Sequence, residues 1–170
     1  MLNKSTHTPL GAAQSAPHHA APALLCTAHC TADAMEVDNA LFNDAFDGRG
    51  EELRRRLAQG ANPNAGSSEG FPALYVAAQQ GHEACVGRLV EAKAAVDAPK
   101  KDGATPLFIA AQNGHEACVS RLVEAKAAVD APMKGGSTPL YIAAQQGHEA
   151  CVGRLVEAKA AVDAPKKDGA

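Results

Sequence analysis

The sequence predicts an all-α solenoid, in which a helix–turn–helix unit recurs every 33 residues. The first observation is that residues 75–101 return as residues 141–167 with a single change, from Val76 to Ile142. The second is that a similar segment, residues 108–134, lies midway between them. The third is that each copy carries two apolar stripes of helical spacing separated by a glycine. Self-similarity this strict is the signature of a repeat architecture.

One unit shows where its two helices begin. Thr105 suits a helix N-cap and Pro106 suits the first helical position, so we expect a first helix through residues 107–113. Gly114 ends that helix, and a second one starts at about His115. Its buried stripe would consist of Cys118, Val119, Leu122 and Val123. A loop rich in glycine and proline then leads to the next unit.

The composition narrows the classes of partner. The chain has 170 residues and a formal net charge of −3, which gives no electrostatic reason to expect nucleic acid or an anionic membrane. No apolar run approaches the roughly 18 residues of a membrane span. Aromatic residues make up only 4% of the chain and tryptophan is absent, so alanine and aliphatic residues must build the core.

Three of the five cysteines, Cys85, Cys118 and Cys151, recur at the 33-residue interval. Stacked helices lie about 8–10 Å apart, whereas a disulfide needs Cα atoms within about 7 Å. We therefore expect free thiols. Buried free thiols suit a reducing compartment, which favours an intracellular, cytoplasmic location, with the nucleus left open.

The motifs at residues 105–110, TPLFIA, and 138–143, TPLYIA, resemble the T-P-L-H-x-A signature of the ankyrin-repeat family. The Gly-His pair after the first helix also fits, and the resemblance covers residues 36–167. It implies an L-shaped stack of helical pairs joined by protruding β-turn loops. The sequence departs from the family at two places in each of the last three units, whereas the first unit keeps the glycine after its second helix as Gly60. Aromatic residues replace histidine at Tyr75, Phe108 and Tyr141, and lysine replaces the glycine after the second helix at Lys93, Lys126 and Lys159.

The predicted organisation has a tail and a repeat domain. Residues 1–35 are rich in alanine, proline, histidine and threonine, so we expect disorder there. A transit peptide is the alternative, although Lys4 is the only fixed positive charge in that segment. Residues 36–170 form the repeat domain: a divergent N-terminal capping repeat (36–68), near-identical repeats (69–101, 102–134 and 135–167) and the start of a truncated further repeat (168–170).

The two ends of the stack differ from its middle. In the capping repeat, Arg54, Arg55 and Arg56 would form the solvated face that a terminal unit needs, with an anion site as the alternative. In the second unit the order Phe71-Pro72-Ala73-Leu74 removes the capping threonine, which predicts a less stable helix start. The last repeat has an interior sequence, so Val152, Leu155 and Val156 would lack neighbours on one side. That end would fray or self-associate.

Two groups of residues could suggest chemistry. The tetrad His-Glu-Ala-Cys begins at His82, His115 and His148, and a residue set copied into every unit indicates a structural role rather than a catalytic one. The cluster of His18, His19, Cys26, His29 and Cys30 contains ligand types that zinc accepts, but its spacing matches no zinc module. We therefore expect no catalytic residue, no cofactor and no bound metal, and we predict that the chain is not an enzyme.

The ankyrin resemblance implies a concave face that binds another protein. The loop tips and the exposed sides of the first helices would form it, which makes the chain a non-catalytic interaction module. The alternative is the targeting arm of a larger protein whose effector domain lies beyond residue 170. The predicted partner-binding residues are Ser67, Ser68, Glu69, Phe71, Gln79, Gln80, Lys100, Lys101, Asp102, Ala104, Gln112, Asn113, Met133, Lys134, Ser137, Gln145 and Gln146.

Overall fold

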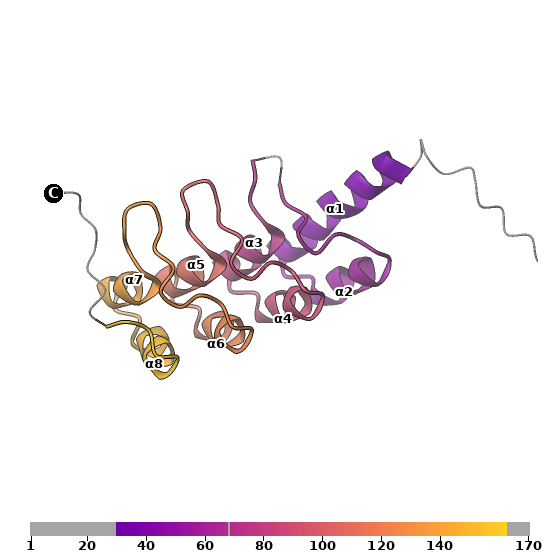
Figure 1. Cartoon of the computed structure of the whole chain (residues 1–170). Coiled ribbons are helices and arrows are strands. Elements are labelled where there is room, and N and C mark those ends of the chain that lie inside the picture. The colour runs from indigo at the N-terminus through magenta and orange to yellow at the C-terminus, as the bar shows by residue number, and fades with distance from the viewer. Residues whose placement is uncertain (1–29, 68, 163–170) are drawn as a thin grey trace, which may run out of the picture.

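The computed structural model describes residues 30–67 and 69–162, and helices dominate that part of the chain (Figure 1). Its only extended pairing is an isolated bridge between Gly66 and Pro72. The all-α prediction is therefore confirmed. The helices are α1 Cys30–Asp47, α2 Gly50–Ala58, α3 Ala73–Gln80, α4 Glu83–Glu91, α5 Pro106–Gln112, α6 Glu116–Glu124, α7 Pro139–Gln146 and α8 Glu149–Glu157.

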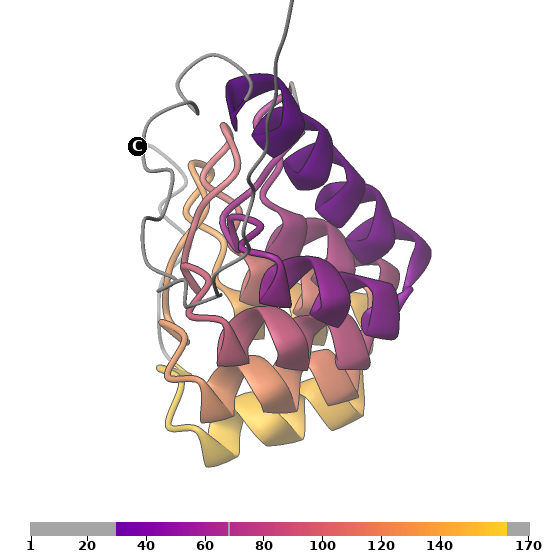
Figure 2. The ribbon, with the colours of Figure 1, turned by 90° about the vertical axis from the view of Figure 1, so that its right-hand side faces the viewer.

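The helices form two parallel rows. Helices α1, α3, α5 and α7 pack side by side in one row, and α2, α4, α6 and α8 pack in the other (Figure 1). Each helix of the first row also packs against the next helix in the chain, which makes four helical pairs. Seen from the α1 end, the loops between the pairs lie together on one side of the helices (Figure 2).

The helix starts follow local sequence. Thr105 Oγ1 accepts a hydrogen bond from the backbone N–H of Phe108 at 3.2 Å, and Thr138 Oγ1 accepts one from Tyr141 at 3.2 Å. Helix α3 begins after Pro72 without any side-chain cap. The missing cap at α3 supports the prediction of a less stable helix start there, because only α5 and α7 have a capping threonine.

The first helix starts earlier than predicted. Helix α1 begins at Cys30, so the expectation that disorder extends to residue 35 is wrong for residues 30–35. The cause is local composition, since alanine, methionine and glutamate at positions 32–36 are strong helix formers that extend the helix towards its N-terminus. The rest of the predicted tail, Ser68 and residues 163–170 lie outside the described residues.

The core consists mostly of leucine, alanine, valine and cysteine, with Tyr75, Phe108, Ile109 and Ile142 among its other buried apolar side chains. One or two leucines from each unit are fully buried, and Cys85, Cys118 and Cys151 are free and 0% exposed. The prediction of buried thiols is confirmed. Val156 is 47% exposed, so the expectation that part of the apolar stripe of the last repeat faces water is confirmed, whereas Leu155 of that stripe is 0% exposed. Helix α8 packs on α6 and α7, and these neighbours cover Leu155 without a further repeat.

The recurring histidines join one unit to the unit before it. His115 Nε2 lies 3.0 Å from the backbone carbonyl of Gln79, and His148 Nε2 lies 3.0 Å from that of Gln112. His82 makes the same contact with Phe46. Because a carbonyl only accepts, Nε2 must carry the proton and donate. These contacts support the structural interpretation of the tetrad.

Side chains from the loops add a second link between units. Asp97 Oδ1 accepts a hydrogen bond from the N–H of Ala128 at 2.9 Å, and Asp130 Oδ1 accepts one from Ala161 at 2.7 Å. Asn64 does the same for Ala95. Each acceptor therefore satisfies a backbone donor of the following unit, which fixes the spacing between successive second helices.

The capping repeat is only partly solvated. Arg54 and Arg55 are exposed and pair with Glu51 and Glu52 one helical turn away. Arg56 differs, because it is half-buried and its Nε donates to the buried carboxylate of Asp44. The prediction of a solvated arginine face is therefore wrong for Arg56, since the fold brings α1 against α2 and supplies a buried partner there.

Lysines occupy a strained backbone conformation after the second helices. Lys93, Lys126 and Lys159 have φ of 64°, 65° and 63°, which is the left-handed region. We expect each substitution to glycine to raise the free energy of unfolding by about 0.5–1 kcal/mol, because glycine adopts this region without a Cβ clash. Urea denaturation would measure the change. Lys134→Gly is the matched control, because Lys134 is exposed and lacks a positive φ. We expect no increase in the free energy of unfolding for this variant. An equal increase would show that relief of the left-handed conformation is not the reason for the stabilisation.

Candidate partner-binding surface

Three hairpin loops project from the helical layer (Figure 1). We call them finger loops; their described residues are 66–67 with 69–72, 99–105 and 132–138. In the second, the N–H of Lys100 donates to the carbonyl of Ala104 at 2.9 Å, and the N–H of Gly103 donates to that of Lys100 at 2.8 Å. The third repeats this pattern. Gly103 has φ of 84°, which explains why glycine closes the turn.

The second and third finger loops are joined through their backbones. The N–H of Lys134, in the third loop, donates to the carbonyl of Asp102, in the second loop, at 3.0 Å. A Cβ at Gly103 would lie 3.2 Å from the same Lys134 nitrogen, so glycine also permits the close approach. The second and third finger loops are therefore held together as one connected surface.

An aromatic and charged cluster lies at the second finger loop. Lys100 Nζ lies 4.7 Å from the ring centroid of Phe71 and 3.4 Å from Asp102 Oδ2. The Phe71 and Tyr75 ring centroids are 5.9 Å apart. The N–H of Ala104 and the Lys100 ammonium lower the pKa of Asp102, so its carboxylate stays charged. Burial, and to a lesser degree Asp102, raises the pKa of Tyr75, so its hydroxyl stays neutral.

The structure places most of the predicted partner-binding residues at the surface. Glu69, Gln80, Lys101, Asn113, Lys134, Gln145 and Gln146 are exposed, and Ser67, Phe71, Gln79, Lys100, Asp102, Gln112 and Met133 are half-buried. Ser68 lies outside the described residues. Two residues require correction: Ala104 is 3% exposed and Ser137 is 9% exposed. Their backbone carbonyls close the bases of the second and third hairpins, which turns both side chains inward.

The predicted partner-binding residues that are exposed or half-buried lie in two rows. The finger loops precede the first helices, whereas Gln80, Gln112 and Gln146 lie at the carboxyl ends of these helices. The first helices have seven or eight residues, and the rise of an α-helix is about 1.5 Å per residue, so the two rows lie about 11–12 Å apart. Asn113 also has a structural role, because its Nδ2 donates to the carbonyl of Gln79 at 2.9 Å. Its substitution would therefore affect the stack as well as any partner.

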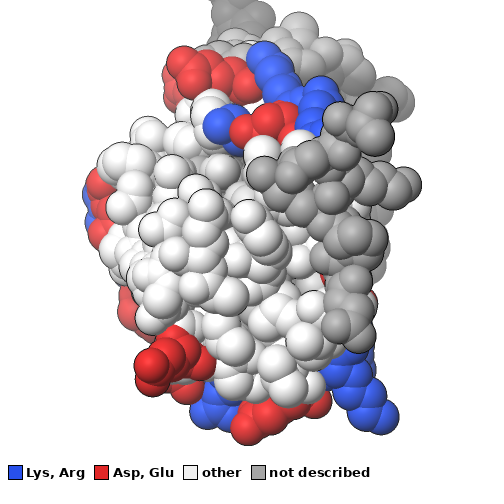
Figure 3. Space-filling model, turned by 90° about the vertical axis from the view of Figure 1, so that its left-hand side faces the viewer, with Lys and Arg blue, Asp and Glu red and all other residues white. Residues whose placement is uncertain are grey.

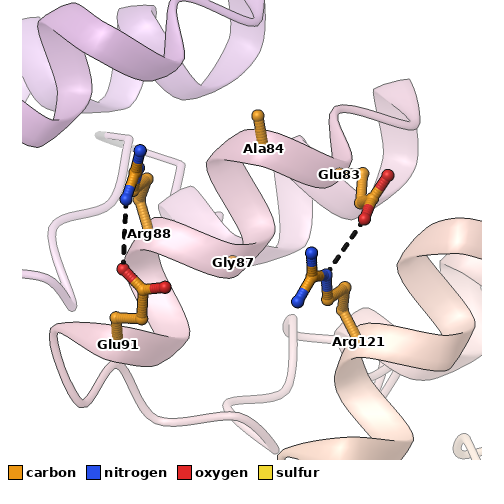
Figure 4. Close-up of a pocket in the computed structure, with 6 residues that line it drawn as sticks. All are labelled: Glu83, Ala84, Gly87, Arg88, Glu91 and Arg121. Carbon is orange, nitrogen blue, oxygen red and sulfur yellow. Dashed lines mark hydrogen bonds and ion pairs between the residues drawn. The ribbon is translucent and has the colours of Figure 1, made fainter.

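Sequence reasoning missed a hollow between second-row helices α4 and α6 (Figure 4). The hollow has a volume of about 310 Å³, and Gly87 contributes no side chain to it. Arg121 Nε lies 3.0 Å from Glu83 Oε1, and Arg88 pairs with Glu91 at 3.4 Å. The four charged side chains thus form two separate ion pairs, and Arg88 also pairs with Glu51 of α2 at 3.4 Å. Only the recurrence of glutamate and arginine in each second helix could have signalled this arrangement.

The buried thiols are poorly suited to nucleophilic chemistry. Burial, with a smaller contribution from Asp44, raises the pKa of Cys85 to about 11. Burial also raises the pKa of Cys118 to about 11 and that of Cys151 in the same direction. The thiolate is the reactive form, so these thiols stay protonated at neutral pH.

The described residues contain no group of three metal-ligating side chains. Cys30 begins α1, but its side chain is not described, and His18, His19, Cys26 and His29 lie outside the described residues. No helix in the described part of the chain is long and apolar enough to cross a membrane.

Stacked helical pairs with projecting hairpins define the class of helical-repeat solenoids. A family model described as ankyrin repeats (three copies) matches residues 41–132 and 74–168. The chain therefore belongs to the ankyrin-repeat family, and the resemblance seen in the sequence is confirmed. Ankyrin repeats are generally protein–protein interaction modules and are typically non-catalytic. A search of curated proteins found no match.

Proposed function

We propose that this chain is a non-catalytic module that binds one partner protein through the finger loops and the carboxyl ends of the first helices. The observation that carries the proposal is the connection of the second and third finger loops by the Lys134–Asp102 hydrogen bond. Preorganised loops lose little conformational freedom on binding, so more of the interaction energy contributes to affinity. In a longer polypeptide, the same surface would serve as a targeting arm.

The exposed residues suggest the character of the partner. Lys101 and Lys134 are exposed at the loop tips, which favours a partner with an acidic rim. The exposed amides of Gln80, Gln145 and Gln146 can donate and accept hydrogen bonds. The net charge of −3 supports a protein partner over nucleic acid or an anionic membrane, and the buried free thiols favour the cytoplasm.

The test is affinity capture from a cell extract with a doubly substituted chain, Lys101→Glu and Lys134→Glu. Proteins captured by the unmodified chain are quantified by mass spectrometry. We expect at least a tenfold loss of the specific partner and no change in melting temperature, because both lysines are exposed. The melting temperature separates lost binding from lost folding.

The matched control is Lys93→Glu with Lys126→Glu. These lysines are also exposed, and the net charge changes equally, but they follow α4 and α6 and lie outside the finger loops. The control should retain the partner. If both double variants lose it equally, the surface is wrongly placed or the attraction depends only on net charge.

A further inference from the structure

The finger loops are joined in two different ways. The N–H of Lys134 donates to the carbonyl of Asp102 at 3.0 Å and links the third loop to the second through the backbone. The counterpart of this bond, 33 residues earlier, would run from the N–H of Lys101 to the carbonyl of Glu69, but these two described residues do not form it. The described residues of the first and second loops are connected by side chains instead.

Lys100 makes that connection. Its Nζ lies 4.7 Å from the ring centroid of Phe71, at the end of the first loop, and 3.4 Å from Asp102 Oδ2, in its own loop. An ammonium over an aromatic face is attracted to the electrons of the ring. The Phe71 ring packs against the core, and its centroid lies 5.9 Å from that of the buried Tyr75 in α3. Lys100 thus links the second loop to a ring that the core already supports.

The neighbouring unit shows that this contact is specific to one place. One unit later, the counterparts of Phe71 and Lys100 are Ala104 and Met133, which have neither a ring nor a charge. That pair of loops has the backbone hydrogen bond instead. The contact between Lys100 and Phe71 is therefore not part of the framework that the units repeat.

The two adjacent lysines of the second loop have different surroundings. Lys100 is half-buried, and a ring and a carboxylate already engage its ammonium. Lys101 is exposed and forms no ion pair with a described residue. In Figure 3, where the finger loops lie at the top, basic and acidic groups gather at that end of the molecule. The ammonium of Lys101 is available to a partner, whereas that of Lys100 is occupied within the chain.

We propose that Lys100 is a positioning residue of the partner-binding surface: it holds Phe71 against the second finger loop, while Lys101 contacts an acidic group of the partner. The inference rests on the proposed function and deepens it, because it assigns different roles to two adjacent identical side chains. Phe71 is half-buried, and a ring that is already held in place loses little conformational freedom when a partner packs on it. Removal of the Lys100 charge therefore weakens binding although Lys100 itself does not contact the partner.

The test makes the same substitution at each lysine, Lys100→Gln and Lys101→Gln, so the net charge changes equally. Amide hydrogen exchange is measured at Gly70 and Phe71 without any partner, because both amides donate hydrogen bonds within the first loop. We expect exchange there to accelerate about two- to fivefold in Lys100→Gln, as loss of one exposed cation–π contact predicts, and to stay unchanged in Lys101→Gln. Equal exchange in the two variants would overturn the proposal.

A conservative variant and an internal control separate positioning from a general loosening of the surface. Lys100→Arg should exchange like the unmodified chain, because a guanidinium keeps the charge, stacks on aromatic rings and pairs with carboxylates. Gly136 is the counterpart of Gly70 in the third loop, and its amide also donates within its loop, to the carbonyl of Met133. Its exchange should not change in any variant. Acceleration at Gly136 equal to that at Gly70 would overturn the proposal.

Capture of the partner from a cell extract completes the test with the same variants. We expect Lys100→Gln and Lys101→Gln each to lower the captured amount severalfold, and Lys100→Arg to retain the partner. Retention by Lys100→Gln together with loss in Lys101→Gln would overturn the positioning role in binding. Retention by both glutamine variants, with the difference in hydrogen exchange intact, would instead reject the proposed function, because the partner would then not use this loop.

Discussion

Tyr75→Ala should lower the free energy of unfolding by about 3–5 kcal/mol, whereas Tyr141→Ala should lower it by about 1–2 kcal/mol. The two tyrosines start nearly identical segments. Tyr75 is 3% exposed under the following unit, and its ring centroid lies 5.9 Å from that of Phe71. Tyr141 is 39% exposed, so its truncation leaves a smaller cavity and removes less buried apolar area.

Urea denaturation followed by circular dichroism would measure both losses, with hydrogen exchange to detect units that unfold separately. The two variants control for each other, since the substitution and the flanking sequence are shared. If the two substitutions lower the free energy of unfolding equally, the unit that covers Tyr75 contributes little to stability. The intrinsic stability of the helices would then determine the stability of the stack.

Gly114→Ala should cost about 2–4 kcal/mol, and Gly147→Ala about 1 kcal/mol. Both glycines lie just after a first-row helix, and their φ angles are nearly the same, 76° and 77°. An added Cβ should therefore cause the same backbone strain at both positions. A Cβ on Gly114 would lie 2.6 Å from His148 Nδ1, whereas a Cβ on Gly147 would meet nothing within 4 Å. The clash displaces the His148 ring and breaks its hydrogen bond to the Gln112 carbonyl, 3.0 Å away.

A double-mutant cycle isolates this contact. In a His148→Ala background, Gly114→Ala should cost no more than Gly147→Ala, because the displaced ring is gone. Denaturation midpoints of the four chains give the coupling. Equal losses at Gly114 and Gly147 in the unmodified background would show that the histidine link between units adds nothing to stability.

Local chemistry determined much of this protein. The helix starts at Thr105 and Thr138 and the break at Gly114 all depend on residues close in sequence. Helix capping and turn formation act over three or four residues, so one unit is enough to predict them. The family assignment followed from the same short motifs.

The sequence located the finger loops, but it did not show which of their side chains are exposed. Ala104 and Ser137 fall in the predicted surface and prove to be buried, because the hairpin turns them inward. Asn113 proves to bind the preceding unit, and its contact with Gln79 spans 34 positions in the chain. Such contacts depend on how units stack, which local pattern does not specify.

Only the tertiary structure decided which residues surround the equivalent side chains of different repeats. Tyr75 and Tyr141 have nearly the same neighbours in sequence, yet one is buried and the other is exposed. Leu155 is buried although its unit lies at the end of the described helices, because α6 and α7 are sufficient to cover it. Arg56 is drawn to Asp44 across the α1–α2 pair. Burial is a property of the assembled stack, because in a solenoid each unit buries its apolar side only against the units next to it.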